Sequence, residues 1–371
     1  MPARFENALR EDGRQMATKV TTGGGKKRTS AATIYDVARR VGVSPMTVSR
    51  VVNGEANVRD TTREAVQKAM RDLQFRPNKA ARSLASASEM RIGLLYNNPS
   101  VAYFTEFLMG ALEGSGRNGA QLVVDKCKVG DPPAAVAAVR TLIKGGVNGM
   151  ILTAPMSESS DLIAELKGLG VAIVGIATGS FSGDITCVGI DDFRAGYDMT
   201  RYLIGQGNRR IGFIKGHPSH SSSRLRLAGF EAAIREASPK VEKPRIAQGF
   251  YSYRSGMIAA DELLSGRLQP TAIFACNDDM ASGAMSVAHR RGLDVPKDMS
   301  VVGVDDTTAS ALWPALTTVR QPIFDIASTA VEVLIQALRG LKTGREPEYQ
   351  NIVLPHLLVE RESAAPPRER A

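Results

Sequence analysis

Eight apolar, often β-branched runs alternate with helix-like stretches between residues 90 and 363. Continuous apolar strands separated by amphipathic helices are typical of parallel sheets that helices cover on both faces. One compact open sheet needs fewer strands, and two of the runs begin alike, at Arg91-Ile92-Gly93 and Arg210-Ile211-Gly212. We therefore predict a body of two doubly wound α/β lobes. The predicted strands are Ile92–Tyr96, Leu122–Val124, Met150–Leu152, Val171–Ile176, Ile211–Ile214, Ile246–Phe250, Ala272–Cys276 and Val301–Val304.

The rest of the chain divides into a helical N-terminal domain, a linker and two tails. Ligands of doubly wound sheets collect beyond the carboxyl ends of the strands, so we expect a ligand site in a cleft between the lobes. Residues 1–30 alternate charge with Gly, Ser and Thr without a sustained period and predict disorder. The predicted boundaries are 1–30 for a disordered extension, 31–76 for the helical domain, 77–89 for a hinge or linker, about 90–190 with 322–350 for the first lobe, about 191–321 with 351–363 for the second lobe, and 364–371 for a disordered tail.

The excess positive charge of the chain is confined to its first quarter. Residues 1–88 hold 17 Lys and Arg against 8 Asp and Glu, and the remainder holds 30 of each, so the whole net charge of +9 lies in the N-terminal part. A basic module on a neutral body suggests a polyanionic partner, most often nucleic acid. A basic disordered tail would carry the same charge, and charge alone does not separate the two interpretations.

Other features exclude several classes of protein. No apolar run is long enough to span a membrane, and the start at Met1 lacks the order of basic, apolar and small residues of a signal peptide. We therefore expect a cytoplasmic protein without a membrane partner. Cys127, Cys187 and Cys276 are far apart and suggest neither a disulfide framework nor a zinc site.

The basic region contains the pattern of two short helices joined by a turn. An apolar stripe begins at Ile34 and stops at Gly42, and a second helix begins with Ser44 as its N-cap and Pro45 at its first position. A third helix follows Asp60. This arrangement matches a helix-turn-helix.

The second helix of this pattern can read DNA bases. In a helix-turn-helix, the start of the second helix enters the major groove. Arg50 can fork onto guanine, Asn53 onto adenine, and Met46 can press on a thymine methyl. The same residues could instead form the solvated face of an ordinary three-helix bundle, and geometry alone leaves both interpretations open. The outward face consists of Met46, Thr47, Ser49, Arg50 and Asn53.

A longer sequence pattern surrounds this motif and continues into the body. It comprises Thr33-Ile34-Tyr35-Asp36-Val37-Ala38, Gly42-Val43-Ser44-Pro45-Met46-Thr47-Val48-Ser49-Arg50-Val51-Val52-Asn53, Thr62-Arg63-Glu64, Phe75-Arg76-Pro77-Asn78, Ala81-Arg82-Ser83-Leu84-Ala85, Gly303-Val304-Asp305-Asp306 and Leu316-Thr317-Thr318-Val319-Arg320-Gln321-Pro322. Through it, residues 33–363 strongly resemble the lactose-repressor family of bacterial transcription regulators. The first thirty residues depart from the family pattern as an extra tail.

The resemblance implies a DNA interface and a hinge. In the family, the positions that face the major groove match Pro45, Met46, Thr47, Ser49 and Arg50. Those matching Asn53 and Asn57 lie near the DNA backbone. The segment around Asn78–Ala85 becomes helical only on operator DNA, where the residue matching Leu84 is wedged into the minor groove. For Leu84 the alternative is packing against the body. The expected DNA-binding residues are Thr33, Tyr35, Ser44, Pro45, Met46, Thr47, Ser49, Arg50, Asn53, Asn57, Asn78, Arg82 and Leu84.

A homodimer on palindromic operator DNA follows from the same geometry. One helix-turn-helix reads few base pairs, and two related by a twofold axis read a palindrome. Tetramers in the family can use a leucine-rich C-terminal helix, which the Pro366-Pro367 end does not favour. We therefore predict a dimer rather than a tetramer.

The body resembles periplasmic sugar-binding proteins, as the family implies, and its expected role is to bind a small-molecule effector. Arg226, Asp305 and Asn277 match family positions that contact the effector, and together they can pair the vicinal hydroxyls of a sugar. Family frequency favours a sugar over a purine, although Tyr103-Phe104 resembles the aromatic pair of purine-responsive members. Packing within a lobe is the alternative role for these aromatic residues. The expected effector-binding residues are Tyr103, Phe104, His220, Ser222, Arg226, Tyr251, Asn277 and Asp305.

Catalysis, metal binding and solute transport are the competing functions. Asp191-Asp192, Asp278-Asp279 and Asp305-Asp306 invite a metal, but each pair stands at a predicted strand-to-helix junction, where Asp caps helices, so we predict no metal and no cofactor. No nucleophile elbow or His-Glu-x-x-His motif appears, so we predict no enzyme. A solute-binding protein would explain the body but not residues 33–85. The best prediction is a transcriptional repressor controlled by an effector bound between the lobes.

Overall fold

The computed structural model describes residues 32–52, 58–75, 90–96, 98–127, 132–176, 179, 183–346 and 348–368. The chain divides into two compact units, residues 1–87 and 88–371, and each is described here by itself. The predicted extension of residues 1–30 and the whole of the predicted hinge at 77–89 lie outside the described residues.

The first unit is a three-helix domain with the predicted turn. Its helices are α1 (Ile34–Val41), α2 (Pro45–Val52) and α3 (Asp60–Asp72). Thr33 and Asp36 form a capping box at the start of α1, and Gly42 ends it with a left-handed backbone at φ 74°. The Ser44 Oγ accepts a hydrogen bond from the backbone N–H of Thr47 at 3.1 Å, which caps α2 as predicted. The buried core consists of Val37, Ala38, Val48, Val51, Val58, Val66 and Ala69.

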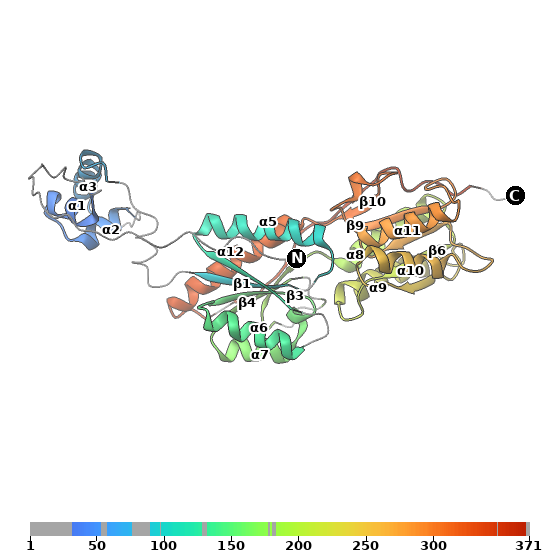
Figure 1. Ribbon diagram of the computed structural model, residues 1–371, viewed down its shortest axis with the longest axis horizontal. Helices are drawn as coiled ribbons and strands as arrows, with labels where there is room; N and C mark the ends of the chain where they lie inside the picture. The colour runs from blue at the N-terminus through green and yellow to red at the C-terminus, as the bar shows by residue number, and fades with distance from the viewer. Residues whose placement is uncertain are drawn as a thin grey trace, which may run out of the picture. The chain divides into compact units, whose positions relative to one another are not determined.

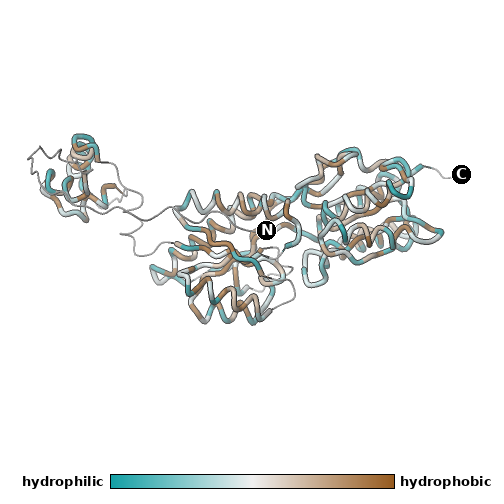
Figure 2. The backbone as a smooth tube through the Cα atoms, in the orientation of Figure 1, coloured by the Kyte–Doolittle hydropathy of each residue, from teal (hydrophilic) through white to brown (hydrophobic). Residues whose placement is uncertain are grey.

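The first lobe of the body is a six-stranded parallel sheet between two layers of helices. Its strand order is β11-β5-β4-β3-β1-β2, formed by Asn351–Val353, Thr186–Gly189, Ala172–Ile176, Gly149–Thr153, Arg91–Tyr96 and Gln121–Lys126. Helices α5 (Val101–Asn118) and α12 (Ile323–Lys342) cover one face, and α6 (Pro132–Lys144) and α7 (Ser160–Gly168) cover the other (Figure 1). Figure 2 shows the apolar residues gathered along the central strands.

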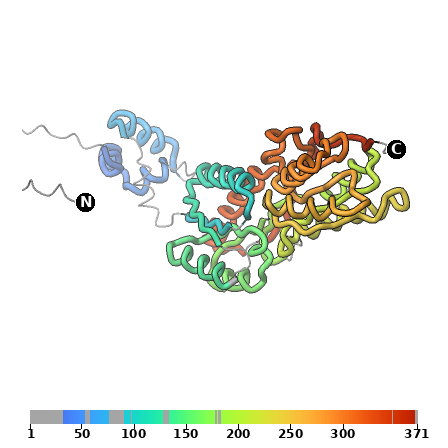
Figure 3. Tube along the Cα trace, turned by 45° about the vertical axis from the view of Figure 1, so that its right-hand side comes forward, coloured from blue at the N-terminus to red at the C-terminus, as the bar shows by residue number. Residues whose placement is uncertain are grey.

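Helix α12 lies beside α5 although the two helices are far apart in the sequence (Figure 3). A Cβ atom at Gly110 would come within 2.2 Å of the carbonyl oxygen of Phe324, so only glycine permits this close approach. The return of the chain through α12 and β11 makes the first lobe a structure of two separate segments.

The second lobe repeats the architecture. Its strand order is β12-β10-β9-β8-β6-β7, formed by Leu357–Val359, Thr317–Arg320, Ser300–Asp305, Ala272–Ala275, Ile211–Lys215 and Arg245–Gln248. Helix α8 (Asp192–Gly205) packs against α9 (Ser221–Ala237), and α10 (Tyr253–Leu263) packs against α11 (Asp278–Arg290). The core contains Phe213, whose ring centroid lies 4.7 Å from that of Phe230 and 5.1 Å from that of Phe274.

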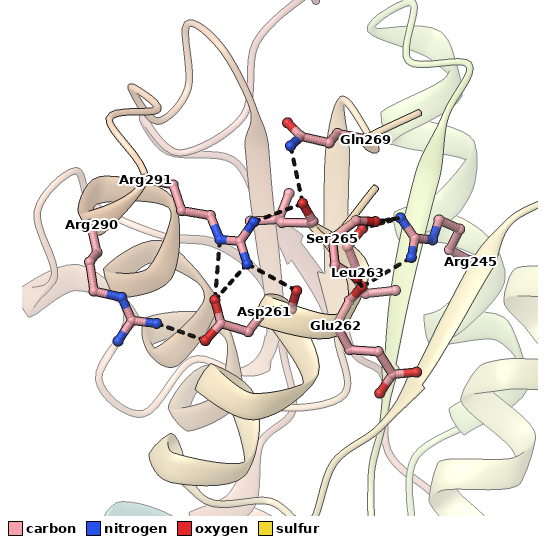
Figure 4. Close-up of polar contacts among 9 residues, drawn as sticks. Arg245, Asp261, Glu262, Leu263, Ser265, Gln269, Arg290 and Arg291 are labelled. Atoms are coloured by element: carbon pink, nitrogen blue, oxygen red, sulfur yellow. Dashed lines mark hydrogen bonds and ion pairs between the residues drawn. The ribbon is translucent and has the colours of Figure 1, made fainter. Parts of the chain in front are cut away.

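Two guanidinium groups close the C-terminal end of α10 (Figure 4). Arg245 donates from Nη1 to the carbonyl oxygens of Leu263 and Ser265 at 2.6 and 2.7 Å, and Arg291 donates to that of Leu264 at 2.8 Å. The last carbonyls of a helix have no partner within the helix and carry partial negative charge, so cations are favoured there.

The structure corrects the predicted organisation at four points. Strands β5, β10, β11 and β12 were not predicted, and β12 pairs antiparallel with β10, so the second sheet is not purely parallel. Residues 351–353, which we assigned to the second lobe, form β11 and pair with β5 in the first. Residues 364–368, predicted as part of a disordered tail, are held against the second lobe, since Ala365 exchanges two hydrogen bonds with the Ser300 hydroxyl. From the sequence we also expected Ala65 on the inner face of the third helix, but it is exposed.

Candidate functional site

Helix α2 presents a face that can contact DNA. Val48 and Val51 are buried, while Met46 is 65% exposed and Arg50 is exposed as well. Thr47 and Ser49 are partly exposed on the same short helix. Tyr35 on α1 is 64% exposed. The structure therefore leaves the expected reading face of the helix-turn-helix accessible in the described part of the domain.

The remaining predicted DNA contacts fall into two groups. Thr33, Ser44 and Pro45 lie at the starts of α1 and α2, where Thr33 and Ser44 also cap the helices. The other residues, Asn53, Asn57, Asn78, Arg82 and Leu84, lie outside the described residues, so their roles stay predictions.

A small cavity of about 50 Å³ lies between the two lobes. Parallel strands of both sheets end here, as expected for a doubly wound fold. The first lobe contributes Tyr103 from α5, and the second contributes residues that follow β6, β7, β8 and β9. The lining residues are Asn98, Tyr103, Thr153, Ala154, Ile176, His220, Ser222, Arg226, Tyr251, Asn277, Asp305 and Gln321.

Arg226 is a buried cation that forms an ion pair with Asp192. Its Nε donates to Oδ1 of Asp192 at 2.8 Å, and its Nη1 donates to the carbonyl oxygen of Cys276 at 2.6 Å. Burial alone would lower the pKa of Arg226, but the charges of Asp192 and other neighbours raise it above its ordinary value, so the guanidinium stays protonated. A ligand at this point meets an oriented and neutralised arginine rather than a free positive charge.

Asp305, the last residue of β9, carries a buried carboxyl group that also lines the cavity. Gln321 donates from Nε2 to its Oδ1 at 2.6 Å. Burial raises the pKa of Asp305, whereas the Arg226 charge acts to lower it. Its backbone has φ 116°, a conformation that costs energy for a residue with a side chain and that clusters at functional sites.

Tyr251 is held in a similarly unusual conformation. Its φ is 60°, and its ring lies so close to Gly216 that a Cβ atom there would come within 2.2 Å of the ring. The Tyr251 hydroxyl lies 3.3 Å from Oγ of Ser222. Burial raises the pKa of Tyr251, so the phenol is neutral and can both donate and accept a hydrogen bond.

His220 adds a neutral imidazole to the cavity. Burial, together with the neighbouring charges of His217 and Arg226, lowers its pKa to about 4. Its ring centroid lies 5.3 Å from that of Tyr251. At neutral pH the ring therefore offers one donor and one acceptor.

Seven of the eight predicted effector residues line this cavity. Phe104 is the exception, because it stacks on Tyr96 with ring centroids 3.8 Å apart and is not among the lining residues. Asn277 lines the cavity, but its amide is engaged within the protein: Oδ1 accepts from the N–H of Met280 as the N-cap of α11, and Nδ2 donates to the carbonyl oxygen of Tyr251.

Several site residues were missed by sequence reasoning. Gln321 and Thr153 line the cavity, and Asp192 supplies the counter-charge of Arg226. Gln321 stands in the Leu316–Pro322 motif that carries the family resemblance, so the signal for it was present. Of the three Asp pairs, only Asp191 caps a helix with its side chain, accepting from the N–H of Arg194 at 2.8 Å. Asp278 instead accepts from the Thr318 hydroxyl and the Thr307 N–H.

Comparison with known proteins identifies the family. Residues 33–78 match the family described as bacterial regulatory proteins, lacI family, and residues 200–364 match a periplasmic binding protein-like domain. The HTH-type transcriptional repressor PurR of Klebsiella pneumoniae (strain 342) is 34% identical over 336 residues, which cover 90% of this chain and 97% of that protein. The chain belongs to the lacI family. This lacI-family protein is thus a DNA-binding transcriptional repressor and not an enzyme.

Solved structures of the family share its architecture. The transcriptional regulator CelR in complex with cellobiose aligns with a TM-score of 0.67 at 28% identity, over 90% of this chain and 99% of that one. The lac repressor dimer bound to operator and the anti-inducer ONPF aligns with a TM-score of 0.69 at 29% identity, over 91% of this chain and all of that one. Both likenesses span the helix-turn-helix and the body together.

Two features of other protein classes are missing from the described residues. These residues contain no helix that is long and apolar enough to cross a membrane. Within the same residues, no three His, Cys, Asp or Glu side chains gather in a way that could hold a metal ion.

Proposed function

We propose that this lacI-family repressor binds a palindromic operator as a homodimer and that a purine-type nucleobase, bound between the lobes, controls this binding. The DNA-binding part acts through the exposed face of α2. Arg50 can make a bidentate contact with guanine, and Met46 can contact a thymine methyl. A repressor of this kind acts where the bacterial DNA is, in the cytoplasm.

Exposed apolar residues on both lobes support dimerisation. Val101, Met109 and Leu112 on α5 are 76, 55 and 48% exposed. Tyr253 and Ile258 on α10 are 45 and 62% exposed. Large apolar side chains at the surface of each lobe are typical of a surface that another protein covers. A second copy of the chain is the occupant that a twofold operator requires. Sedimentation at the dimer mass is expected, and the tetramer mass would contradict this part of the proposal.

The cavity chemistry supports a flat, neutral heterocycle. Tyr103 and Tyr251 offer aromatic faces for stacking, His220 offers one donor and one acceptor, and the Asp305 carboxylate can accept from a ring N–H. The relatives support the same choice, since the protein with the highest identity reported above, at 34%, carries the name PurR. The sequence alone favoured a sugar, and the purine alternative now has the stronger support.

A sugar stays the second candidate. The CelR structure, 28% identical, holds cellobiose. The Arg226 guanidinium and the Asp305 carboxylate could also pair hydroxyl groups. The present cavity of about 50 Å³ holds neither ligand, since small-molecule sites have volumes of roughly 300–1,000 Å³. Binding therefore requires lining side chains, such as the Tyr251 ring, to move aside. The effector regulates only because it binds the DNA-competent and DNA-incompetent states with unequal affinity.

Calorimetry on the full chain tests the effector class. Hypoxanthine, guanine and adenine are titrated beside cellobiose and ribose, with wild-type protein and Asp305→Asn. We expect at least one purine to bind wild type and Asp305→Asn to bind it at least about tenfold more weakly, because the carboxyl group that pairs with the ring N–H is replaced by an amide. Asp261→Asn is the matched control, since Asp261 forms an exposed ion pair with Arg290 and Arg291. Binding of a sugar without binding of any purine would show that the effector is a sugar.

A further inference from the structure

A contact between the lobes joins the first lobe to the helix that carries the effector residues. Helix α9 begins at Ser221, and both Ser222 and Arg226 on this helix line the cavity. Glu158, at the end of the short 3-10 helix Met156–Glu158 of the first lobe, accepts hydrogen bonds from both the backbone N–H and the hydroxyl of Ser221. Its second oxygen lies 3.9 Å from the Arg224 guanidinium.

Helix α9 lacks an N-terminal anion of its own. Its N-cap residue, His220, makes no side-chain capping hydrogen bond, and the first turn holds no acidic residue. The first N–H groups of a helix lack partners within the helix and carry partial positive charge. The Glu158 carboxylate therefore provides, from the other lobe, the interaction that a capping residue normally provides.

The position of Glu158 is fixed by its own lobe. The neighbouring Ser157 is buried, and its hydroxyl donates to the carbonyl oxygen of Ile176 at the end of β4. On the other side, Ser159 caps α7. The contact with Ser221 is thus made by a residue anchored at both neighbours.

A second segment of the first lobe contacts the same serine. A Cβ atom at Gly179 would come within 2.1 Å of Cβ of Ser221, so the backbone of Gly179 lies directly against this side chain. A side chain at position 179 would overlap Ser221, so the two residues would have to move apart. Ser221 itself is 2% exposed.

We propose that Glu158 and Gly179 form a latch on Ser221, which holds the lobes closed and sets the orientation of α9 at the effector cavity. Glu158 is then a positioning residue: it acts on the ligand through α9. An effector that binds the closed form has an apparent Kd that rises as the closed fraction falls, so weakening the latch weakens effector binding. This last consequence rests on the proposed function, whereas the latch itself does not.

Hydrogen exchange on the full chain without effector tests the latch directly. In Glu158→Ala, amide exchange in the first turn of α9 should rise about tenfold, as expected for a lost interaction at a helix N-terminus. Glu158→Gln keeps an acceptor and should recover part of the protection. Gly179→Ala should raise exchange at the same amides, because the added methyl group would disrupt the contact between position 179 and Ser221. Glu165→Gln, which alters an ion pair with Arg140 inside the first lobe, should leave α9 unchanged.

Exchange in other helices distinguishes loss of the latch from a general loss of stability. Hypoxanthine binding tests the effector class separately. Exchange in α10 should stay as in wild type, and a rise throughout the second lobe would contradict a local latch. Unchanged α9 exchange in both Glu158→Ala and Gly179→Ala would overturn the proposal. Where wild type binds hypoxanthine, Glu158→Ala should raise its Kd about 3- to 10-fold. Absence of hypoxanthine binding by wild type would count against the proposed effector alone, because the exchange result decides the latch independently.

Discussion

Arg226 and Asp192 form an ion pair of 2.8 Å in which each side chain is only 5% exposed. The two residues come from α9 and α8. These helices pack closely because Gly196 has no side chain, and a Cβ atom there would lie 2.2 Å from the carbonyl oxygen of Arg226. The pair therefore fixes the effector site to the core of the second lobe, and the cavity has a neutral arginine–aspartate unit before any ligand arrives.

Asp192→Asn should strongly destabilise the second lobe. Removing one partner of a buried ion pair leaves an uncompensated buried charge, at a cost of about 3–5 kcal/mol. Asp198→Asn on the same helix is the control, since Asp198 pairs with Arg194 at 2.8 Å but the two side chains are 31 and 59% exposed. It should cost less than about 1 kcal/mol. Urea unfolding measures both, and equal losses would show that burial does not set the strength of the Arg226 pair.

His220→Gln should make the protein less sensitive to acid. Burial lowers the pKa of His220 to about 4, below the ordinary value of 6.5. Between these two values the unfolded chain binds a proton that the folded chain excludes, so stability present above pH 6.5 is lost as the pH falls towards 4. Glutamine has no such proton, and the stability lost over this window should be smaller in the variant by about 3 kcal/mol.

Denaturant unfolding at pH 8 and at steps down to pH 4 tests the His220 prediction. The pH 8 values compare packing alone, because the imidazole is neutral there. Buried carboxyl groups with a raised pKa, such as Asp305, are present in both proteins and cancel in the comparison. Parallel pH profiles would show that His220 is accessible to protons in the folded state.

Arg245→Ala should destabilise the second lobe by about 2 kcal/mol, because three carbonyl oxygens at the end of α10 lose a charged donor. Arg290→Ala is the control in the same cluster (Figure 4). Arg290 makes one exposed contact with Asp261, which Arg291 also binds, so its loss should be nearly neutral. Thermal unfolding ranks the two variants, and a larger effect of Arg290→Ala would contradict the capping role.

The sequence predicted most of the strands that are apolar runs buried on both faces. β3 (Gly149–Thr153) and β8 (Ala272–Ala275) are apolar runs that are wholly buried in the structure. β11 and β12 escaped prediction because they are only three residues long and lie at sheet edges, partly exposed. β10 (Thr317–Arg320) is rich in threonine, and its burial depends on the return of the C-terminal segment across it.

The effector site was predicted less completely, for a physical reason. Family positions located Arg226, Asp305 and Asn277, and each lines the cavity. Asp192 was missed because an Asp at a strand-to-helix junction normally caps the helix, and only the packing of α8 on α9 turns it towards Arg226. Phe104 was included because Tyr103-Phe104 resembles the aromatic pair of purine-responsive members, but successive residues of a helix point in different directions, and Phe104 stacks on Tyr96 instead.

Arg50→Ala should weaken binding to the preferred operator by about 1–3 kcal/mol and relax the choice of base at one position per half-site. Arg71→Ala is the control variant, because Arg71 lies in the last turn of α3 and not on the reading face of α2. Selection of duplexes from a random library, followed by fluorescence anisotropy on single-base variants, measures both. An equal loss on every duplex would assign Arg50 to phosphate contacts rather than to base reading.

We propose above all that a small molecule between the lobes changes the affinity of the dimer for operator DNA. The most direct measurement is anisotropy of the selected duplex with the full chain, with and without hypoxanthine, and with Asp305→Asn beside wild type. The account predicts one preferred palindromic sequence and at least about a fivefold change of Kd with effector, which Asp305→Asn abolishes without altering effector-free binding. Binding without sequence preference, or a Kd that neither purines nor sugars change, would contradict it.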